Sequence, residues 1–415
     1  MPKLALGNNL TKGGVQEPEH TNIYSLTFDG TDDYLEVPLS YDIYNGGTIK
    51  PITVAFWIKK AAWENASDTG RIFSDDGYQT AFSIREYGTS GQWRLLAMYG
   101  GVGSSEHSII LKTGSSSINS WIHVAMTLGS TADESSEYTS KIYLNGALVP
   151  SGDTASGDNT EQVTVTEYAT LHYLRIGKDR NQNNYWQGRI SDAAVWDATL
   201  DADDISKIYN SGKPLNLKRA SSYNTSRTSN LLGWWRFGDG ALDGLPVIGD
   251  EVDATLGSEL LDETSNFTDG NWDDGAQIAF SSNNIDFTRS DDGDGTYTTQ
   301  NLTENSAFTV VAGSVYVVTV TVSAYTTGRF LAKVGNGNDA KPSTSDGTFI
   351  STIWAGGVGT YTFKIQAANT TEFTLFVHSS EGFHGSISNM SVKKINGNPG
   401  YMLNMTESDI ERDAP

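Results

Sequence analysis

Short stretches in which apolar and polar residues alternate recur along the chain and predict β-strands. This two-residue period marks residues 24–28, 52–58, 121–128, 361–365 and 373–377. Residues 141–144 run directly into Asn145-Gly146, the dipeptide most typical of a two-residue type I′ hairpin turn. The pattern therefore predicts an all-β protein.

Residues 171–212 carry the clearest local pattern in the chain. Within residues 189–196 apolar side chains occur at both odd and even positions, which predicts a strand buried on both faces. Strict alternation places Ile190 on the same face as Ala194 and Trp196, and Ala193 with Val195 on the opposite face.

A short helix is predicted immediately after this strand. Asp201 is placed to cap its first turn, with Asp204 three residues later. Ile205, Ile208 and Tyr209 recur at helical spacing, and Gly212 with Pro214 ends the helix.

Five segments together resemble laminin-G-like jelly rolls of the concanavalin A-like lectin/glucanase superfamily. They are SLTFDGTDDYLEVP, WIHVAMTL, KIYLNGAL, the strand and helix of residues 171–212, and LLGWWRFGDG. The resemblance implies a β-sandwich over residues 23–240.

A second all-β pattern follows a Gly- and Asp-rich connector at residues 241–257. ELLDETSNFTDGNW at its start and GSISNMSV at its end resemble a carbohydrate-binding-module jelly roll of the galactose-binding-like kind, over residues 258–396. The predicted fold is thus all-β, with two tandem β-sandwich (jelly-roll) domains and short polar terminal arms.

The terminal arms, residues 1–22 and 397–415, have no apolar periodicity. We expect one or the other to become ordered only in contact with other chains, because ordering each residue costs about 1–2 kcal/mol of backbone entropy. The C-terminal arm is slightly favoured, because its apolar cluster is denser. The apolar residues available for docking are Leu4, Leu6 and Leu10 in one arm and Tyr401, Met402, Leu403 and Met405 in the other.

The formal net charge of −22 argues against nucleic acid or an anionic membrane as the main partner. The chain has no cysteine, so disulfides and thiol chemistry are excluded. We find neither a signal peptide nor a membrane-spanning stretch, and therefore expect synthesis in a host cytoplasm.

No enzymatic site is predicted. Glucan-cleaving members of the superfamily carry paired glutamates on one face of a strand, and this chain has no E-x-D-x-x-E strand. The six histidines are scattered without metal-ligand spacing.

Glycan binding needs aromatic faces beside amide and carboxylate groups. The polar loop before residue 189 offers Asn183, Tyr185 and Trp186, and the second domain offers Tyr325 and Trp354. The alternative for Trp186 is that it packs beneath the hairpin.

Calcium is the candidate metal, because it prefers hard oxygen ligands. Asp192 is the one charged residue inside its strand apart from Arg189 at its start, and it is a candidate ligand together with Asp29. The alternative is that Asp192 accepts backbone hydrogen bonds at a strand end.

The terminal sequences LGNNLTKGG and GNPGYMLNMTESDIERDAP and the order of the two domains resemble tailed-phage virion proteins. This resemblance implies a non-enzymatic protein on the particle exterior, such as a head decoration, collar or fibre protein. Its expected partners are other virion proteins, copies of itself in a homo-oligomer, and host-surface glycans. The alternative is a secreted bacterial adhesin, or the accessory carbohydrate-binding part of a polysaccharide-degrading system.

Overall fold

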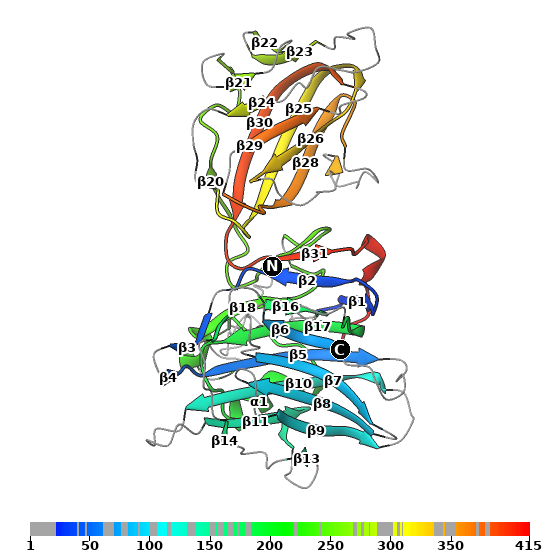
Figure 1. Ribbon diagram of the computed structural model, residues 1–415, viewed down its shortest axis with the longest axis vertical. Helices are drawn as coiled ribbons and strands as arrows, with labels where there is room; N and C mark the ends of the chain where they lie inside the picture. Colours follow the sequence, from blue (N-terminus) through cyan, green and yellow to red (C-terminus); the bar gives the residue numbers. More distant parts are fainter. Residues whose placement is uncertain are drawn as a thin grey trace, which may run out of the picture.

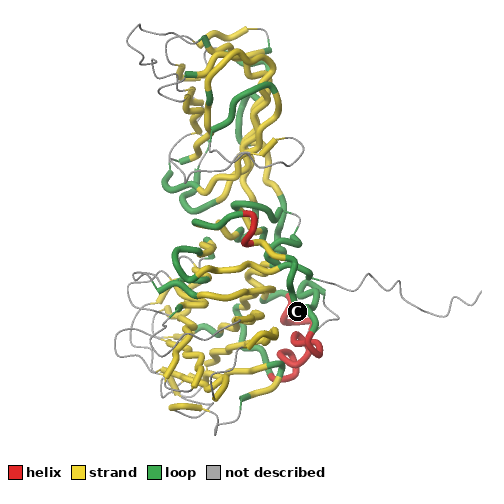
Figure 2. The backbone as a smooth tube through the Cα atoms, turned by 90° about the vertical axis from the view of Figure 1, so that its right-hand side faces the viewer, coloured by secondary structure: helices red, strands yellow, loops and turns green. Residues whose placement is uncertain are grey.

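The computed structural model shows an elongated molecule of two β-sandwich domains, one above the other (Figures 1 and 2). It describes residues 22–39, 41–45, 48–60, 70–75, 82–89, 92–99, 106–113, 118–130, 138–149, 154–156, 162–163, 169–171, 174–178, 184–219, 223, 225–240, 242–268, 272–274, 278–281, 283–288, 302–304, 308, 310–335, 343–344, 354–370, 373–377 and 382–415. The N-terminal arm, apart from Asn22, lies outside these residues. Among the described residues, no helix is long and apolar enough to cross a bilayer.

The first domain packs two antiparallel sheets face to face. The first sheet has the order β12-β11-β10-β5-β17-β1-β32, with β14 beside β11 and β18 beside β17. Its strands are β1 (Ser25–Asp29), β5 (Ile52–Lys60), β10 (Ile118–Ser130), β11 (Tyr138–Leu144), β12 (Ala147–Leu148), β14 (Gln162–Val163), β17 (Gln187–Trp196), β18 (Leu231–Trp235) and β32 (Ile410–Glu411).

The second sheet of this domain has the order β13-β9-β8-β7-β6-β16-β2-β31-β19. Its strands are β2 (Tyr34–Val37), β6 (Arg71–Asp75), β7 (Phe82–Thr89), β8 (Gln92–Tyr99), β9 (Glu106–Thr113), β13 (Thr154–Ser156), β16 (Leu174–Ile176), β19 (Val247–Ile248) and β31 (Gly400–Leu403). A small third sheet contains β15 (Ala169–Leu171), β3 (Tyr41–Asn45) and β4 (Thr48–Ile49).

The second domain is a smaller pair of sheets. One sheet contains β20 (Leu256–Glu259), β22 (Ile278–Ser281), β23 (Asn284–Phe287), β25 (Val315–Gly328), β27 (Ser343–Thr344), β28 (Gly359–Gln366) and β30 (Phe383–Ile395). The other contains β21 (Trp272–Asp274), β24 (Leu302–Glu304), β26 (Phe330–Val334) and β29 (Phe373–Val377). The all-β sandwich prediction is confirmed.

The C-terminal segment belongs to the first domain, which differs from the expected free tail at residues 397–415. Strand β31 lies beside β2 and pairs with it (Figure 1). It also pairs with β19, and β32 pairs with β1. The apolar residues of the segment account for this, because Tyr401, Met402 and Met405 are 1%, 3% and 4% exposed. The second domain is therefore an insertion between two strands of the first, and β19 lies within the stretch expected to be a connector.

The short helix α1 (Ala202–Tyr209) forms as predicted and covers the outer face of the first sheet. The Asp201 side chain accepts a hydrogen bond from the backbone N–H of Asp204 at 2.9 Å. The helix ends at Asn210, which adopts the left-handed conformation (φ 46°). Ile205 and Ile208 of the helix pack with Ala194 and Trp196 of β17 in a core layer of their own.

The remaining helical segments are short. They are α2 (Thr225–Thr228) and the 3-10 turns η2 (Asn210–Gly212) and η4 (Glu407–Asp409). The predicted hairpin at Asn145-Gly146 is confirmed, because both residues have positive φ, 48° and 78° respectively, as a type I′ turn requires.

The faces predicted for β17 are wrong at one position. Ile190 lies in the main sandwich core with Ala193 and Val195, not on the outer face with Ala194 and Trp196. The pairing with β5 shifts register between Ser191 and Ala194, and Asp192 within this β-bulge has φ 46°. The extra residue reverses the alternation, so side chains after the bulge point to the opposite face from the one that strict alternation assigns.

Candidate functional site

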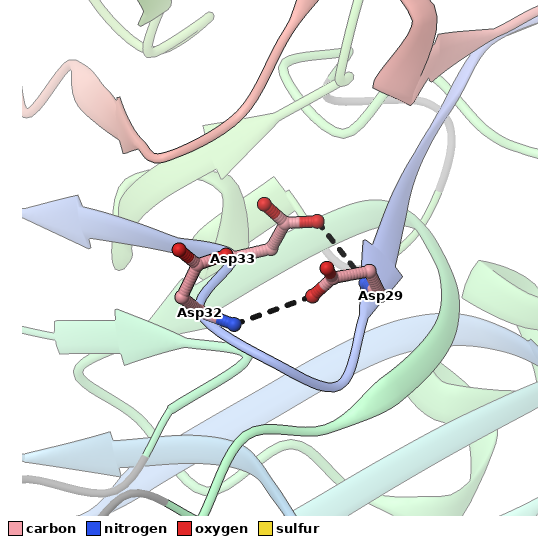
Figure 3. A group of neighbouring side chains, drawn as sticks. All are labelled: Asp29, Asp32 and Asp33. Atoms are coloured by element: carbon pink, nitrogen blue, oxygen red, sulfur yellow. Dashed lines mark hydrogen bonds between the residues drawn. The ribbon is translucent and has the colours of Figure 1, made fainter.

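The turn between β1 and β2 gathers three carboxylates, those of Asp29, Asp32 and Asp33 (Figure 3). Asp29 accepts the backbone N–H groups of Thr31 (2.7 Å) and Asp32 (3.3 Å), and Asp33 accepts the backbone N–H of Asp29 at 3.1 Å. One carboxylate oxygen from each residue lies within 4.8 Å of the others. These hydrogen bonds hold the turn in a conformation that brings the negative charges together.

The environments of these carboxylates differ. Burial and the neighbouring negative charges raise the pKa of Asp33 to about 6, despite its hydrogen bond from Asp29. The pKa of Asp29 lies below its usual value. Burial alone would raise this pKa, but the hydrogen bonds from the N–H groups of Thr31 and Asp32 stabilise the carboxylate and outweigh that effect. Asp29 and Asp32 are exposed, which leaves negative oxygens at the surface. Such oxygens are ligands that calcium prefers.

Two tyrosines and a lysine adjoin this turn. The rings of Tyr34 and Tyr185 lie 6.4 Å apart at 48°. The Lys178 ammonium lies 4.3 Å from the centre of the Tyr34 ring and 5.1 Å from that of Tyr185. We call Asp29, Asp32, Tyr34, Lys178 and Tyr185 the turn surface. It combines aromatic rings with charged hydrogen-bonding groups, which is the composition that saccharides require.

Tyr185 was predicted from the sequence, whereas Tyr34 and Lys178 were not. They come together because β2 and β16 are neighbours, with Leu35 opposite Ile176. Tyr34 and Lys178 lie just outside that pair. The pairing of two strands about 140 residues apart is not visible in a single sequence.

Trp186 does not offer a stacking surface, which corrects the prediction of a glycan contact there. Its side chain is 0% exposed and packs in the main core, where its ring lies 6.0 Å from that of Phe28. Gly70 and Gly188 allow this packing, since a Cβ on either would come within about 3 Å of Trp186 atoms. The alternative reading, a Trp packed beneath the hairpin, matches this position. Asn183 lies outside the described residues.

Asp192 is a buried structural carboxylate. It accepts hydrogen bonds from Asn22 Nδ2 (2.6 Å) and from Trp234 Nε1 (2.8 Å). Burial raises the pKa of Asp192 to about 6, in opposition to those two hydrogen bonds.

The structure separates the two calcium candidates. Asp29 is opposite Gln187, five positions before Asp192 on β17, so the two lie roughly 15 Å apart at strand spacing. A calcium ion bonds oxygens at about 2.5 Å and cannot bridge that gap. Asp29 and Asp192 therefore do not form one metal site, and Asp29 gathers with Asp32 and Asp33 instead.

A second aromatic surface lies on the inserted domain. Tyr325 is 39% exposed and packs against Phe383, with ring centres 6.3 Å apart. The loop at residues 354–359 passes beside it, and a Cβ on Gly356 would lie 3.6 Å from the Tyr325 ring. Trp354 is half-buried against the core, while Val358 is 68% exposed. The structure thus brings Tyr325 close to the loop that contains Trp354. Val358 of the same loop is an exposed apolar residue that the sequence did not single out.

Residues 29–206 match the family model described as the concanavalin A-like lectin/glucanases superfamily. The first domain is a laminin-G-like jelly roll. The match ends before the inserted domain. A search of curated proteins returned no match.

Several solved structures are similar to this chain at low identity. A heptameric pentraxin from Limulus polyphemus is 21% identical over 47% of this chain and 86% of its own, with a TM-score of 0.34. A putative carbohydrate-binding protein from Bacteroides ovatus is 15% identical over 55% of this chain and 56% of its own, with a TM-score of 0.33. Domains LG4-5 of the mouse laminin α1 chain are 10% identical over 98% of this chain and 99% of their own, with a TM-score of 0.26.

Proposed function

We propose that this protein is a non-enzymatic glycan-binding protein whose first domain binds a saccharide at the turn surface. The observation that supports this most directly is the packing of Tyr34 and Tyr185 around Lys178, beside the exposed carboxylates of Asp29 and Asp32. Ring faces pack against the apolar faces of sugars, and the charged groups hydrogen-bond to sugar hydroxyls. The lectin-like fold of the domain is compatible with a binding role.

A glycan array probed with the whole protein tests this proposal, followed by titration of any hit against Y185A. Removal of the ring is expected to weaken binding by about tenfold or more, the cost of losing one well-packed aromatic contact. L148A is a matched control, because Leu148 is 42% exposed in the same domain but on β12. Equal affinity of Y185A and L148A would place the glycan elsewhere.

Calcium is the cofactor that we propose for the carboxylates of the turn surface. Differential scanning calorimetry with calcium or magnesium tests it. Calcium is expected to raise the melting temperature of the wild type more than magnesium does, because calcium accepts an irregular set of carboxylate oxygens whereas magnesium demands near-octahedral geometry and gives up its water reluctantly. The effect should disappear in D29N/D32N and persist in D192N; its persistence in D29N/D32N would refute the assignment.

The non-enzymatic part of the proposal has its own test. Incubation of the purified protein with β-glucans and other polysaccharides is expected to release no reducing sugar. Turnover that disappears on mutation of a single carboxylate would overturn it.

We further propose that the protein acts on the exterior of a tailed-phage virion, as a head decoration, collar or fibre protein. The support is the resemblance of the terminal sequences LGNNLTKGG and GNPGYMLNMTESDIERDAP, and of the β-sandwich domains between them, to tailed-phage virion proteins. Portal, capsid and tail genes beside this one, followed by cryo-EM of the particle, would test the location, the virion partners and the homo-oligomeric state. A neighbourhood of polysaccharide-degrading or secretion genes would favour the alternative of a secreted adhesin or an accessory carbohydrate-binding protein.

A further inference from the structure

A row of side chains crosses adjacent strands of the first sheet on its outer face. Arg189 of β17 is opposite Lys59 of β5. The Lys59 ammonium lies 5.9 Å from the centre of the Trp121 ring, which extends the row to β10. Ile58 and Ile190, the chain neighbours of the two cations, lie in the sandwich core. Lys59 and Arg189 therefore point to the opposite side, away from the core.

Two carboxylates of the C-terminal segment lie on this row. Asp413 accepts hydrogen bonds from Lys59 Nζ (2.9 Å), from Trp121 Nε1 (3.4 Å) and from Arg189 Nη1. Glu411 pairs with Arg189 as well. Burial raises the pKa of Asp413, but the Lys59, Trp121 and Arg189 donors outweigh it and leave this pKa below its usual value. We call Lys59, Trp121 and Arg189 the carboxylate-binding row.

The row recognises a carboxylate by charge and by geometry. Three donors from three strands converge on one carboxylate, and charge-assisted hydrogen bonds of this kind are stronger than neutral ones. The strands that present them are central to the sheet, so the donors stay in place whether or not Asp413 is there.

The hold on Asp413 itself is weak. The side chains of Lys59, Arg189 and Asp413 are 20%, 31% and 29% exposed, and ion pairs that solvent reaches contribute little stability. The backbone pairing of β32 with β1 includes just Ser25–Glu411 and Leu26–Ile410, and does not reach Asp413. Asp413 can therefore leave the row without disruption of the sheet.

We propose that the carboxylate-binding row is a receptor for the carboxylate of an acidic saccharide, such as a hexuronate, and that Asp413 competes with it from within the chain. This inference rests on the proposed glycan-binding function and narrows the ligand to a uronate-containing class. An external carboxylate can bind only when Asp413 has left the row, so its apparent affinity is reduced in proportion to the fraction of molecules in which the row is open.

Isothermal titration calorimetry with trigalacturonate tests the proposal on the full chain. D413N keeps the shape of the competitor but removes its charge. D413N is expected to bind trigalacturonate about tenfold more tightly than the wild type. A gain of this size follows if the fraction of molecules with an open row rises from about 10% towards unity. The fully methyl-esterified trisaccharide, which lacks the charge, is expected to show no such gain.

Two further variants separate the row from general electrostatics. D203N is the matched control, because Asp203 also pairs with a lysine, Lys207, on the same domain, yet lies on α1 and away from the row. It removes the same charge and is expected to bind as the wild type does. K59Q/R189Q in the D413N background is expected to lose the gained affinity.

Several outcomes would overturn the proposal. Equal affinities of wild type and D413N would do so, as would an equal gain for the methyl ester or for D203N. Self-association of D413N in sedimentation, without uronate binding, would show that the row takes an acidic segment of a second copy instead. If neutral glycans bind with sensitivity to Y185A while D413N gains nothing for the uronate, this inference fails and the proposed function stands. If no glycan binds any variant, both fail.

Discussion

The backbone N–H of Asn398 donates to Oδ2 of Asp250 at 3.0 Å, and this contact joins the two chain segments that connect the domains. Asp250 precedes the inserted domain and Asn398 follows it. Close by, the backbone N–H of Asn396 donates to the carbonyl of Thr255 at 2.9 Å. The chain therefore leaves and re-enters the first domain at one place.

Contacts between the domains surround this crossing. Val247 and Tyr401 of the first domain form a buried cluster with Val315 and Ile395 of the second. Lys364 of β28 donates to the carbonyl oxygens of Leu242 (2.9 Å) and Gly244 (3.3 Å). Burial lowers the pKa of Lys364, in opposition to the nearby charge of Asp243.

Excision of the inserted domain is expected to leave the first domain folded. Leu256 pairs with Ile395 across the crossing, so an Asn-Gly dipeptide can replace residues 257–394 as a two-residue hairpin turn. Circular dichroism and calorimetry should show a cooperative β-protein, somewhat less stable than the first domain of the whole chain because Val315 no longer covers Val247. Deletion of residues 397–415 is the contrasting variant. It removes β31 from within a sheet, and should unfold or severely destabilise the first domain.

Replacement of Asp250 by alanine is expected to cost about 3 kcal/mol or more of unfolding free energy, because several buried donors lose their acceptor. Asp250 is 0% exposed and accepts the backbone N–H groups of Trp234, Val252 and Asn398. Urea denaturation gives the difference. D253A is the control, since Asp253 is exposed and its carboxylate accepts one described hydrogen bond, from the Thr255 hydroxyl; loss of this carboxylate should cost under about 0.5 kcal/mol. Similar losses for both variants would contradict the role of Asp250.

The sequence predicted local features well where adjacent residues determine them. The cap at Asp201 and the turn at Asn145-Gly146 depend on residues within one turn of chain. The bulge at Asp192 was not predictable. A bulge is defined by one extra residue relative to the partner strand, and a run of apolar residues does not reveal it until that partner is known. Strict alternation consequently placed Ile190 on the wrong face.

Pairings between distant segments explain the other differences. Tyr401 and Met402 form an apolar cluster that is visible in the sequence. Their partner strand β2 lies most of the chain away, and their other partner β19 lies on the far side of the inserted domain in sequence. Because no neighbouring segment of the sequence could pair with this tail, we expected it to become ordered only against another chain. Tyr185 and Trp186 have similar neighbours in sequence, yet one is half-buried at the surface and the other is in the core. Composition alone cannot separate such adjacent aromatics.

Replacement of Gly146 by valine is expected to destabilise the first domain by about 1–3 kcal/mol, the usual cost of forced backbone strain. Gly146 has φ 78°, and a Cβ there would lie 2.9 Å from the Tyr209 ring of α1. Thermal unfolding measures the loss. A147V changes the adjacent exposed strand residue and should have little effect. An unchanged melting temperature for G146V would count against both the turn and its contact with α1.

His123 is expected to make the stability of the protein depend on pH in acid. The side chain is 1% exposed, packs beside Trp57 at 4.9 Å between ring centres, and its Nδ1 has no hydrogen-bond partner in the described structure. Burial lowers the pKa of His123 to about 3, below the ordinary value of 6.5. As the pH falls below 6.5, His123 gains a proton in the unfolded chain but not in the folded chain. Acid therefore favours the unfolded chain, and the unfolding free energy of the protein falls.

The response can be isolated with H123F, which keeps an aromatic ring beside Trp57 and has no proton to gain. Asp33 and Asp192, whose pKa values are raised to about 6, act in the opposite sense, because their contribution to stability is lost as the pH rises through about 6. Wild type and H123F both contain Asp33 and Asp192, so the effect of these carboxylates cancels in the difference between the two proteins. The unfolding free energy of H123F relative to wild type is expected to rise by about 1.4 kcal/mol per pH unit on acidification below pH 6, as urea denaturation at pH 7, 6, 5 and 4 would show. Parallel curves for H123F and wild type would mean that His123 is protonated as readily in the folded protein as in the unfolded chain.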